Sequence, residues 1–391
     1  MSAPSPVRPD AATVDLLRTL VAFPTVSRDS NLDLIAYVQD RLRALGADVR
    51  LTHDDERRKA NLFASFGGRD GGIVLSGHTD VVPIDGQQWD SDPYTLVEKD
   101  GAYYARGTSD MKGFIACVLA LLPELLARPL RKPLHVALSY DEEVGCIGVG
   151  RMLDDLVRAG IRADGCIVGE PTLMTPVIAH KGKRAWRCTV TGLASHSAYA
   201  PRGVNAVEAA AEAVAFLKRL AREHRDRGPY DRSFDVAYST VHTGVIRGGT
   251  ALNIVPEYCS FDFEFRHLPG DDPEALLAAF RRYVTEELEP EMQAVARHTG
   301  FRIEQLSSIP ALDVAPETEI VALAQDLSGC CDIDKVSYGT EASQFQTIGI
   351  PAVVCGPGSI QQAHKPNEYV TAEQLARCET FLRRLGERMA G

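Results

Sequence analysis

Four short apolar runs, each followed by carboxylate or imidazole side chains, are the feature that most restricts how this chain can fold. They cover residues 73–75, 134–138, 166–168 and 352–355. Near-continuous hydrophobicity predicts sheet strands that are covered on both faces. Helical patterns lie between the runs at 114–122, where Pro123 should end or kink the helix, and at 152–157. Strands that alternate with helices predict an α/β layered domain.

The pattern changes between residues 184 and 308. It predicts, in order, a strand at 184–191, a helix at 205–223, strands at 237–246 and 258–266, a helix at 273–288 and a strand at 301–306. This βαββαβ order is the split βαβ pattern of a small ferredoxin-like domain. We therefore expect a larger domain in two parts, 1–183 and 309–391, interrupted by an insertion domain at 184–308.

Composition narrows the classes of partner. With 391 residues, 45% of them hydrophobic, the chain can bury a large core. The net charge of -11 argues against nucleic acid or an anionic membrane as partner. No secretory signal is recognisable and no apolar run approaches the ~18 residues of a membrane span, so we expect a cytoplasmic protein. The nine cysteines show no CxxC spacing and are odd in number, which argues against a disulfide framework.

The first apolar run leads into His78-Thr79-Asp80. Strand alternation puts the imidazole and the carboxylate on one side. A metal-bound histidine usually gives its second N–H to such a carboxylate. Taken alone this pair is a weak signal.

Further ligand-type residues follow the other predicted strands or precede a helix: Asp110, Glu142, Glu143, Glu170 and His364. Each has an ordinary explanation as a helix cap, a surface charge or a turn residue. Together they recur after the carboxyl ends of strands, where ligands bind in open α/β sheets. Two histidines and three carboxylates could hold two divalent ions if one carboxylate bridges them.

These motifs resemble the superfamily of zinc-dependent aminoacylases, carboxypeptidases and desuccinylases over nearly the whole chain. The shared motifs are GHTDVVP at 77–83, GTSDMKG at 107–113, DEE at 141–143, GEP at 169–171 and AHKP at 363–366. Within the superfamily the chain resembles the acetylornithine deacetylases, through VPIDG at 82–86, FIAC at 114–117 and SHSAYAP at 195–201. The resemblance implies a zinc-exopeptidase-like catalytic domain, with a mixed sheet between helices, and a ferredoxin-like lid or dimerisation domain.

The resemblance also implies a dinuclear metal site. His78 and Glu170 would bind one ion, Glu143 and His364 the other, and Asp110 would bridge both. Zn(II) is the expected metal and Co(II) an alternative, since both accept nitrogen and oxygen ligands.

By the same resemblance Glu142 is the general base, which takes a proton from the metal-bridging water and delivers it to the departing amine. Asp80 would orient His78. His196 would reach the active site of the opposite subunit and steady the oxyanion, which implies a homodimer. The expected substrate contacts are Asn253, Arg266, Tyr199 and Glu341.

The reaction implied is hydrolysis of N-acetyl-L-ornithine to L-ornithine and acetate, a step of arginine biosynthesis, with Glu341 facing the distal ammonium. Two alternatives keep the chemistry but change the substrate: a succinyl-diaminopimelate desuccinylase and a general N-acyl-amino-acid amidohydrolase. A third is a non-catalytic metal-binding relative. Glu142 beside a complete ligand set argues against the third, because a protein that only binds needs no general base.

Overall fold

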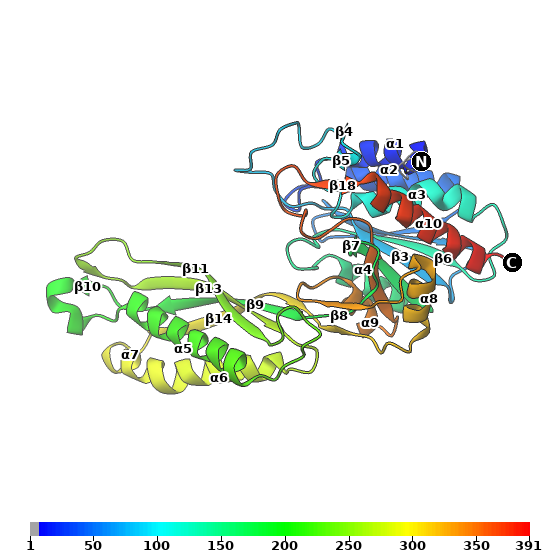
Figure 1. Ribbon diagram of the computed structural model, residues 1–391. Coiled ribbons are helices and arrows are strands. Elements are labelled where there is room, and N and C mark those ends of the chain that lie inside the picture. The colour runs from blue at the N-terminus through cyan, green and yellow to red at the C-terminus, as the bar shows by residue number, and fades with distance from the viewer. Residues whose placement is uncertain (1–7) are drawn as a thin grey trace, which may run out of the picture. The chain divides into compact units, whose positions relative to one another are not determined.

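The computed structural model describes residues 8–391, which divide into two compact units. Unit 1 contains the described residues up to Ala179 together with Leu312–Lys335 and Thr340–Gly391, and unit 2 contains His180–Ala311 and Val336–Gly339 (Figure 1). The sequence suggested boundaries at 184 and 308. No helix within residues 8–391 is long and apolar enough to cross a membrane.

Unit 1 is built on a nine-stranded mixed sheet in the order β1-β2-β6-β3-β7-β17-β8-β15, with β16 paired to β8. Strands β6, β3, β7 and β17 are parallel neighbours, whereas β1, β2 and β6 pair antiparallel. The strands are β1 (Asp48–His53), β2 (Ala60–Phe66), β3 (Ile73–His78), β6 (Leu134–Ser139), β7 (Gly165–Pro171), β8 (Val177–His180), β15 (Leu312–Asp313), β16 (Asp334–Val336) and β17 (Ala352–Gly356). The four predicted apolar strands are β3, β6, β7 and β17, and the predicted α/β fold with a mixed sheet is confirmed.

The helices of unit 1 are α1 (Ala11–Val21), α2 (Leu32–Ala44), α3 (Lys112–Leu125), α4 (Val149–Arg158), α8 (Glu319–Ser328), α9 (Ala342–Thr347) and α10 (Ala372–Met389). Helices α1, α3, α10 and α8 pack against one another in that order, and α3 contacts β3 and β7. Helix α3 is apolar around most of its circumference because it lies between this sheet and its neighbouring helices.

Pro123 does not end α3, which continues to Leu125. The proline lies in the last turn, so the hydrogen bond that its missing N–H removes, to the carbonyl of Leu119, is lost close to the helix end. The expectation that the helix ends before Pro123 is therefore wrong, whereas the alternative, a kink at the proline, stays a prediction.

A second, three-stranded sheet of unit 1 has the order β18-β5-β4 and consists of β4 (Val97–Lys99), β5 (Ala102–Tyr104) and β18 (Tyr369–Thr371). Its antiparallel β5–β18 pairing runs from Tyr104 opposite Tyr369 to Ala102 opposite Thr371. The loop that follows β5 therefore lies beside the segment that precedes β18.

Unit 2 has the predicted βαββαβ order. Its elements are β9 (Gly182–Thr191), α5 (Ala206–Arg227), β11 (Thr240–Gly248), β13 (Tyr258–His267), α6 (Pro273–Tyr283), η2 (Val284–Leu288), α7 (Glu289–Val295) and β14 (Gly300–Ile309). The antiparallel sheet has the order β11-β13-β9-β14, and α5 and α6 lie side by side along it (Figure 1). Trp186, Phe263 and Phe265 form the centre of its core, with ring centroids 4.8–5.7 Å apart.

Candidate metal centre

The register of the parallel strands brings candidate ligands from distant parts of the chain to one edge of the unit 1 sheet. Strand β3 is parallel to β6 and to β7, with His78 opposite Ser139 and Ser76 opposite Val168. His78 comes two residues after Ser76, and Glu170 comes two residues after Val168, the partner of Ser76. The two side chains therefore lie at the same position along the neighbouring strands β3 and β7.

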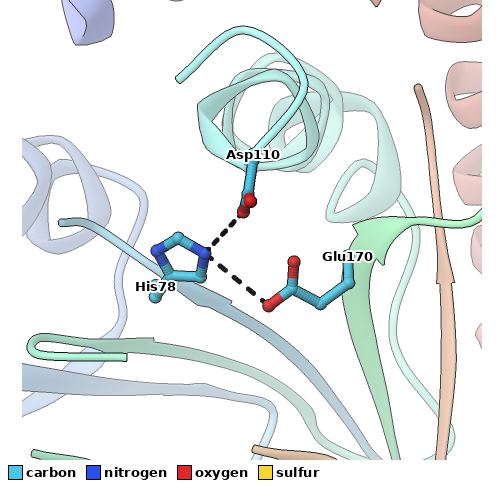
Figure 2. A group of neighbouring side chains, drawn as sticks. All are labelled: His78, Asp110 and Glu170. Atoms are coloured by element: carbon cyan, nitrogen blue, oxygen red, sulfur yellow. Dashed lines mark hydrogen bonds and ion pairs between the residues drawn. The ribbon is translucent and has the colours of Figure 1, made fainter. Parts of the chain in front are cut away.

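The first group of candidate ligands is His78, Asp110 and Glu170, all at least 95% buried. His78 Nε2 lies 2.9 Å from Asp110 Oδ1 and 3.6 Å from Glu170 Oε1. Figure 2 shows one ring nitrogen of His78 facing both carboxylates, with Asp110 just before α3 and Glu170 on β7. One imidazole and two carboxylates converge here in a site closed to solvent.

The second group shares Asp110 with the first and adds Glu143 and His364. His364 Nε2 lies 2.9 Å from Glu143 Oε2 and 3.2 Å from Asp110 Oδ2. In each group one ligand atom per residue lies within 4.8 Å of all the others. Because Asp110 uses Oδ1 toward one group and Oδ2 toward the other, its carboxylate is placed to bridge.

The electrostatics of both groups favour added positive charge. Burial raises the pKa of Glu143 to about 8 and the pKa of Glu170 well above its ordinary value. Burial acts in the same direction on Asp110, but hydrogen bonds from His364 and His78 outweigh it and hold its pKa below the ordinary range. Hydrogen bonds to Asp110 and Glu143 raise the pKa of His364 to about 10.

The residues present fit a pair of divalent cations. Buried carboxylates outnumber the cationic side chains around them, and such charges need a counter-ion or a metal. Glu143 Oε1 is a buried oxygen with no hydrogen-bond partner among residues 8–391. Two imidazoles and three carboxylates are also the nitrogen and oxygen donors that Zn(II) accepts.

Asp80 contacts His78 mainly through its main chain. His78 Nδ1 lies 2.9 Å from the carbonyl oxygen of Asp80 and 3.6 Å from its Oδ1. The carboxylate accepts hydrogen bonds from Ser27 Oγ at 2.6 Å and from the main-chain N–H of Glu142 at 3.1 Å and Glu143 at 3.3 Å. Asp80 therefore fixes the turn that carries Glu142 and Glu143 as well as the imidazole.

Glu142 lies in the turn after β6, and burial raises its pKa to about 7. Its Oε1 accepts a hydrogen bond from the thiol of Cys146 at 3.2 Å. The preceding Asp141 has a left-handed backbone (φ 57°) and is held by Lys59, whose Nζ is 2.6 Å from Asp141 Oδ1. Cys146 and Lys59 were missed in the sequence, because neither belongs to a ligand pattern.

Glu341, the predicted contact to a substrate ammonium, is 1% exposed in unit 1. Its Oε2 accepts a hydrogen bond of 2.8 Å from Ser139 Oγ, and Ser139 is the residue opposite His78. Its Oε1 is buried and has no hydrogen-bond partner in the described part of the chain. Burial raises the pKa of Glu341 to about 7.

The remaining predicted residues lie in unit 2. His196 ends the short strand β10 (Ser195–His196) and Tyr199 lies in η1 (Ser197–Arg202), with the two ring centroids 6.4 Å apart. Asn253 precedes β12 (Ile254–Val255), which pairs with β10, and its carbonyl accepts a hydrogen bond from the N–H of Ser197. Arg266 lies on β13, with its Nε 3.1 Å from Glu264 Oε1.

Two groups of imidazole and carboxylate side chains converge at the carboxyl ends of the parallel strands, in an arrangement that suits metal-assisted hydrolysis. The model of peptidase family M20/M25/M40 matches residues 74–388. This match covers most of the chain, and the protein belongs to that family.

Relatives agree with this assignment. The chain is 40% identical over 382 residues to an acetylornithine deacetylase of Myxococcus xanthus, with 94% of this chain and 95% of the relative covered. A tripeptidase of Staphylococcus aureus has a similar structure, with a TM-score of 0.75 at 20% identity over 98% of this chain and 99% of the other. A dinuclear metal binding peptidase of Bacillus subtilis gives a TM-score of 0.65 at 15% identity, with 96% of each chain covered.

Proposed function

We propose that this hydrolase converts N-acetyl-L-ornithine to L-ornithine and acetate, using two divalent metal ions. The observation that carries the reaction class is the pair of ligand groups joined by Asp110. The proposed substrate is supported by the similarity to the Myxococcus enzyme, which extends over almost the full length of both chains.

In this proposal His78 and Glu170 hold one ion, Glu143 and His364 hold the second, and Asp110 contacts both. When bound, such ions polarise the substrate carbonyl and lower the pKa of water. We expect Zn(II), with Co(II) able to replace it, because both accept this nitrogen and oxygen donor set. The B. subtilis peptidase, described as dinuclear, has the same fold.

Glu142 is the proposed general base. Its pKa of about 7 lies close to a working pH near neutral, where a carboxylate can both accept and return a proton. It would take the proton of the attacking water and pass it to the nitrogen of the leaving amine, so the same carboxylate serves both halves of the reaction.

Glu341 is the proposed recognition group for the side-chain ammonium of ornithine. A buried acceptor without a donor costs about 1–3 kcal/mol, and an ammonium would supply that donor. Ornithine carries this ammonium, whereas norvaline of nearly equal shape does not. Glu341→Gln should therefore reduce the preference for N-acetyl-L-ornithine over N-acetyl-L-norvaline, and an unchanged preference would remove this role.

A homodimer with His196 supplied by the second copy completes the proposal. Strand β11 forms one edge of the unit 2 sheet and carries Val245, 41% exposed, and Ile246, 52% exposed. An exposed sheet edge of this kind can pair with another chain. Sedimentation equilibrium should give twice the chain mass for the wild type and a shift toward the monomer in Ile246→Lys. A wild-type monomer would remove the dimer and the role of His196 in trans.

The substrate is tested by comparing N-acetyl-L-ornithine with N-succinyl-diaminopimelate and an uncharged N-acetyl amino acid in one turnover assay. We expect the highest kcat/KM for N-acetyl-L-ornithine. A higher value for the succinyl compound would indicate a desuccinylase, and similar values for all N-acetyl compounds would indicate a general amidohydrolase.

A further inference from the structure

Glu368 is a buried carboxylate that no ligand group includes. It is 1% exposed and accepts four hydrogen bonds from the loop that ends at Asp110. Its Oε2 accepts from Arg106 Nη1 at 2.7 Å and from the N–H of Gly107 at 3.0 Å. Its Oε1 accepts from the N–H of Ser109 at 2.8 Å and of Asp110 at 3.0 Å. The loop is therefore folded around one carboxylate.

The last of these bonds acts directly on a candidate ligand. The hydrogen bond to the main-chain N–H of Asp110 holds the backbone of this residue in place. It therefore also positions its carboxylate, whose two oxygens point to the two ligand groups. The main chain of Glu368 holds the beginning of the same loop, because its carbonyl accepts a hydrogen bond from the N–H of Ala105 at 3.1 Å. This bond extends the β5–β18 pairing up to the base of the loop.

Arg106, the ion-pair partner of Glu368, also connects the loop to the segment of the second histidine. Glu368 comes four residues after His364, and Arg106 Nη1 contacts the carbonyl of Lys365 at 3.3 Å in addition to Glu368. Arg106 Nη2 donates to Gln87 Oε1 at 2.6 Å, and Gln87 Nε2 in turn donates to the carbonyl of His364 at 3.0 Å. Asp110 and His364 are therefore attached to one hydrogen-bonded frame centred on the Arg106–Glu368 ion pair.

We propose that Glu368 is a positioning residue that sets the distance between Asp110 and His364 and so determines the affinity and coordination geometry of the metal pair. The inference rests on the proposed metal centre. A carboxylate is required here because all four donors point to its oxygens, which leaves no place for the N–H₂ group of an amide. Partners of this kind typically change metal affinity by about 10–100-fold when they are removed.

Glu379 provides the matched control. It is another buried glutamate of unit 1, 2% exposed, and it accepts hydrogen bonds from the N–H of Asp10 at 2.8 Å and from Thr13 Oγ1 at 2.5 Å. It anchors α1 to α10 and contacts neither ligand group. Both variants therefore lose a buried, hydrogen-bonded carboxylate, but only Glu368 is connected to Asp110; Glu379 accepts fewer hydrogen bonds, and its Oε2 lies 3.6 Å from Nη1 of the half-exposed Arg383.

The test is titration of the metal-stripped full-length protein with Co(II), followed by visible absorption, in wild type, Glu368→Gln and Glu379→Gln, with thermal unfolding measured in parallel. We expect Glu368→Gln to bind Co(II) about 10-fold or more weakly, with an altered spectrum. Glu379→Gln should unfold at a lower temperature but keep the wild-type affinity and spectrum. The proposal is overturned if both variants lose stability and neither changes Co(II) binding.

Glu368→Asp serves if the glutamine variant does not fold. Aspartate keeps the charge opposite Arg106 but is shorter by one methylene, so it cannot reach all four donors. A folded aspartate variant with wild-type Co(II) affinity and spectrum would also overturn the proposal. Because none of these readouts uses a substrate, a wrong substrate leaves the test intact, whereas a wild type that binds no Co(II) removes both the metal centre and the role of Glu368.

Discussion

Replacing Gly169 by alanine should weaken both the fold of unit 1 and its metal affinity. An ideal Cβ at this position would lie 2.0, 2.1 and 2.4 Å from three ring atoms of Phe114. Carbon atoms in contact are normally about 3.5–4.0 Å apart, so the ring or the strand must move by about 1.5 Å. Phe114 is 2% exposed, so its ring is surrounded by other side chains of the core. Overpacking of this kind costs about 1–3 kcal/mol of unfolding free energy.

The same displacement should reach the ligands. Gly169 directly precedes Glu170 on β7, and Phe114 lies in the first turn of α3, just after Asp110. Separating β7 from α3 therefore separates two members of the first ligand group, and we expect Co(II) affinity to fall by about 10-fold.

Urea unfolding of the metal-free protein and Co(II) titration measure the two effects separately. Gly150→Ala is the control, because a Cβ there meets nothing within 4 Å and the residue lies in α4. This control should be stabilised by about 0.4–1 kcal/mol or be unchanged. A Gly169→Ala protein as stable as the wild type, with unchanged Co(II) affinity, would refute the packing argument.

Three further predictions follow from the site and the thiols. Glu142→Gln should keep its metal but lose about 10²–10⁴-fold in kcat, and the acid limb below pH ~7 should disappear from its kcat/KM profile; a retained rate would exclude the base role. Because Asp110 and Glu143 raise the pKa of His364 to about 10, this imidazole is protonated at pH 7 and must lose its proton to bind metal. Apparent metal affinity should therefore rise with pH, and calorimetry in buffers of different ionisation enthalpy should show proton release on binding; pH-independent affinity would contradict this. All nine cysteines are free: seven are buried, Cys330 is half-buried and Cys331 is exposed, so Cys331 should react fastest with a thiol reagent and Cys331→Ser should remove the fastest phase; an unchanged fastest phase would contradict the assigned exposure.

The fold was predictable because its signals are local. Buried parallel strands need continuous apolar runs, and the unit 2 sheet needs alternating ones, so both units are visible as patterns. Sequence alone does not show where a helix will end, so the helical residues Glu124 and Leu125 beyond Pro123 were not predicted.

The candidate ligands were predictable for a geometric reason. His78 and Glu170 lie at the carboxyl ends of β3 and β7, and Glu143 follows β6; because the carboxyl ends of parallel strands meet at one edge of a sheet, residues far apart in the sequence are brought together. The structure places all five of the predicted ligands in two groups that share Asp110.

The supporting contacts were not predictable in the same way. Glu368 lies in the segment His364-Lys365-Pro366-Asn367-Glu368, but three of its four donors are main-chain N–H groups, which carry no sequence identity. Asp80 was expected to orient His78 through its carboxylate, yet that carboxylate accepts the amides of the Glu142 turn. Contacts to the main chain depend on loop conformation, which residue spacing does not determine.

The most direct test of the account is hydrolysis of N-acetyl-L-ornithine by metal-stripped protein to which Zn(II) or Co(II) is added stepwise, with ornithine measured by ninhydrin or NMR. The account predicts no release without metal and a rate that rises until two ions are bound per chain. Release that persists in excess chelator, or no release with two ions bound, would contradict it.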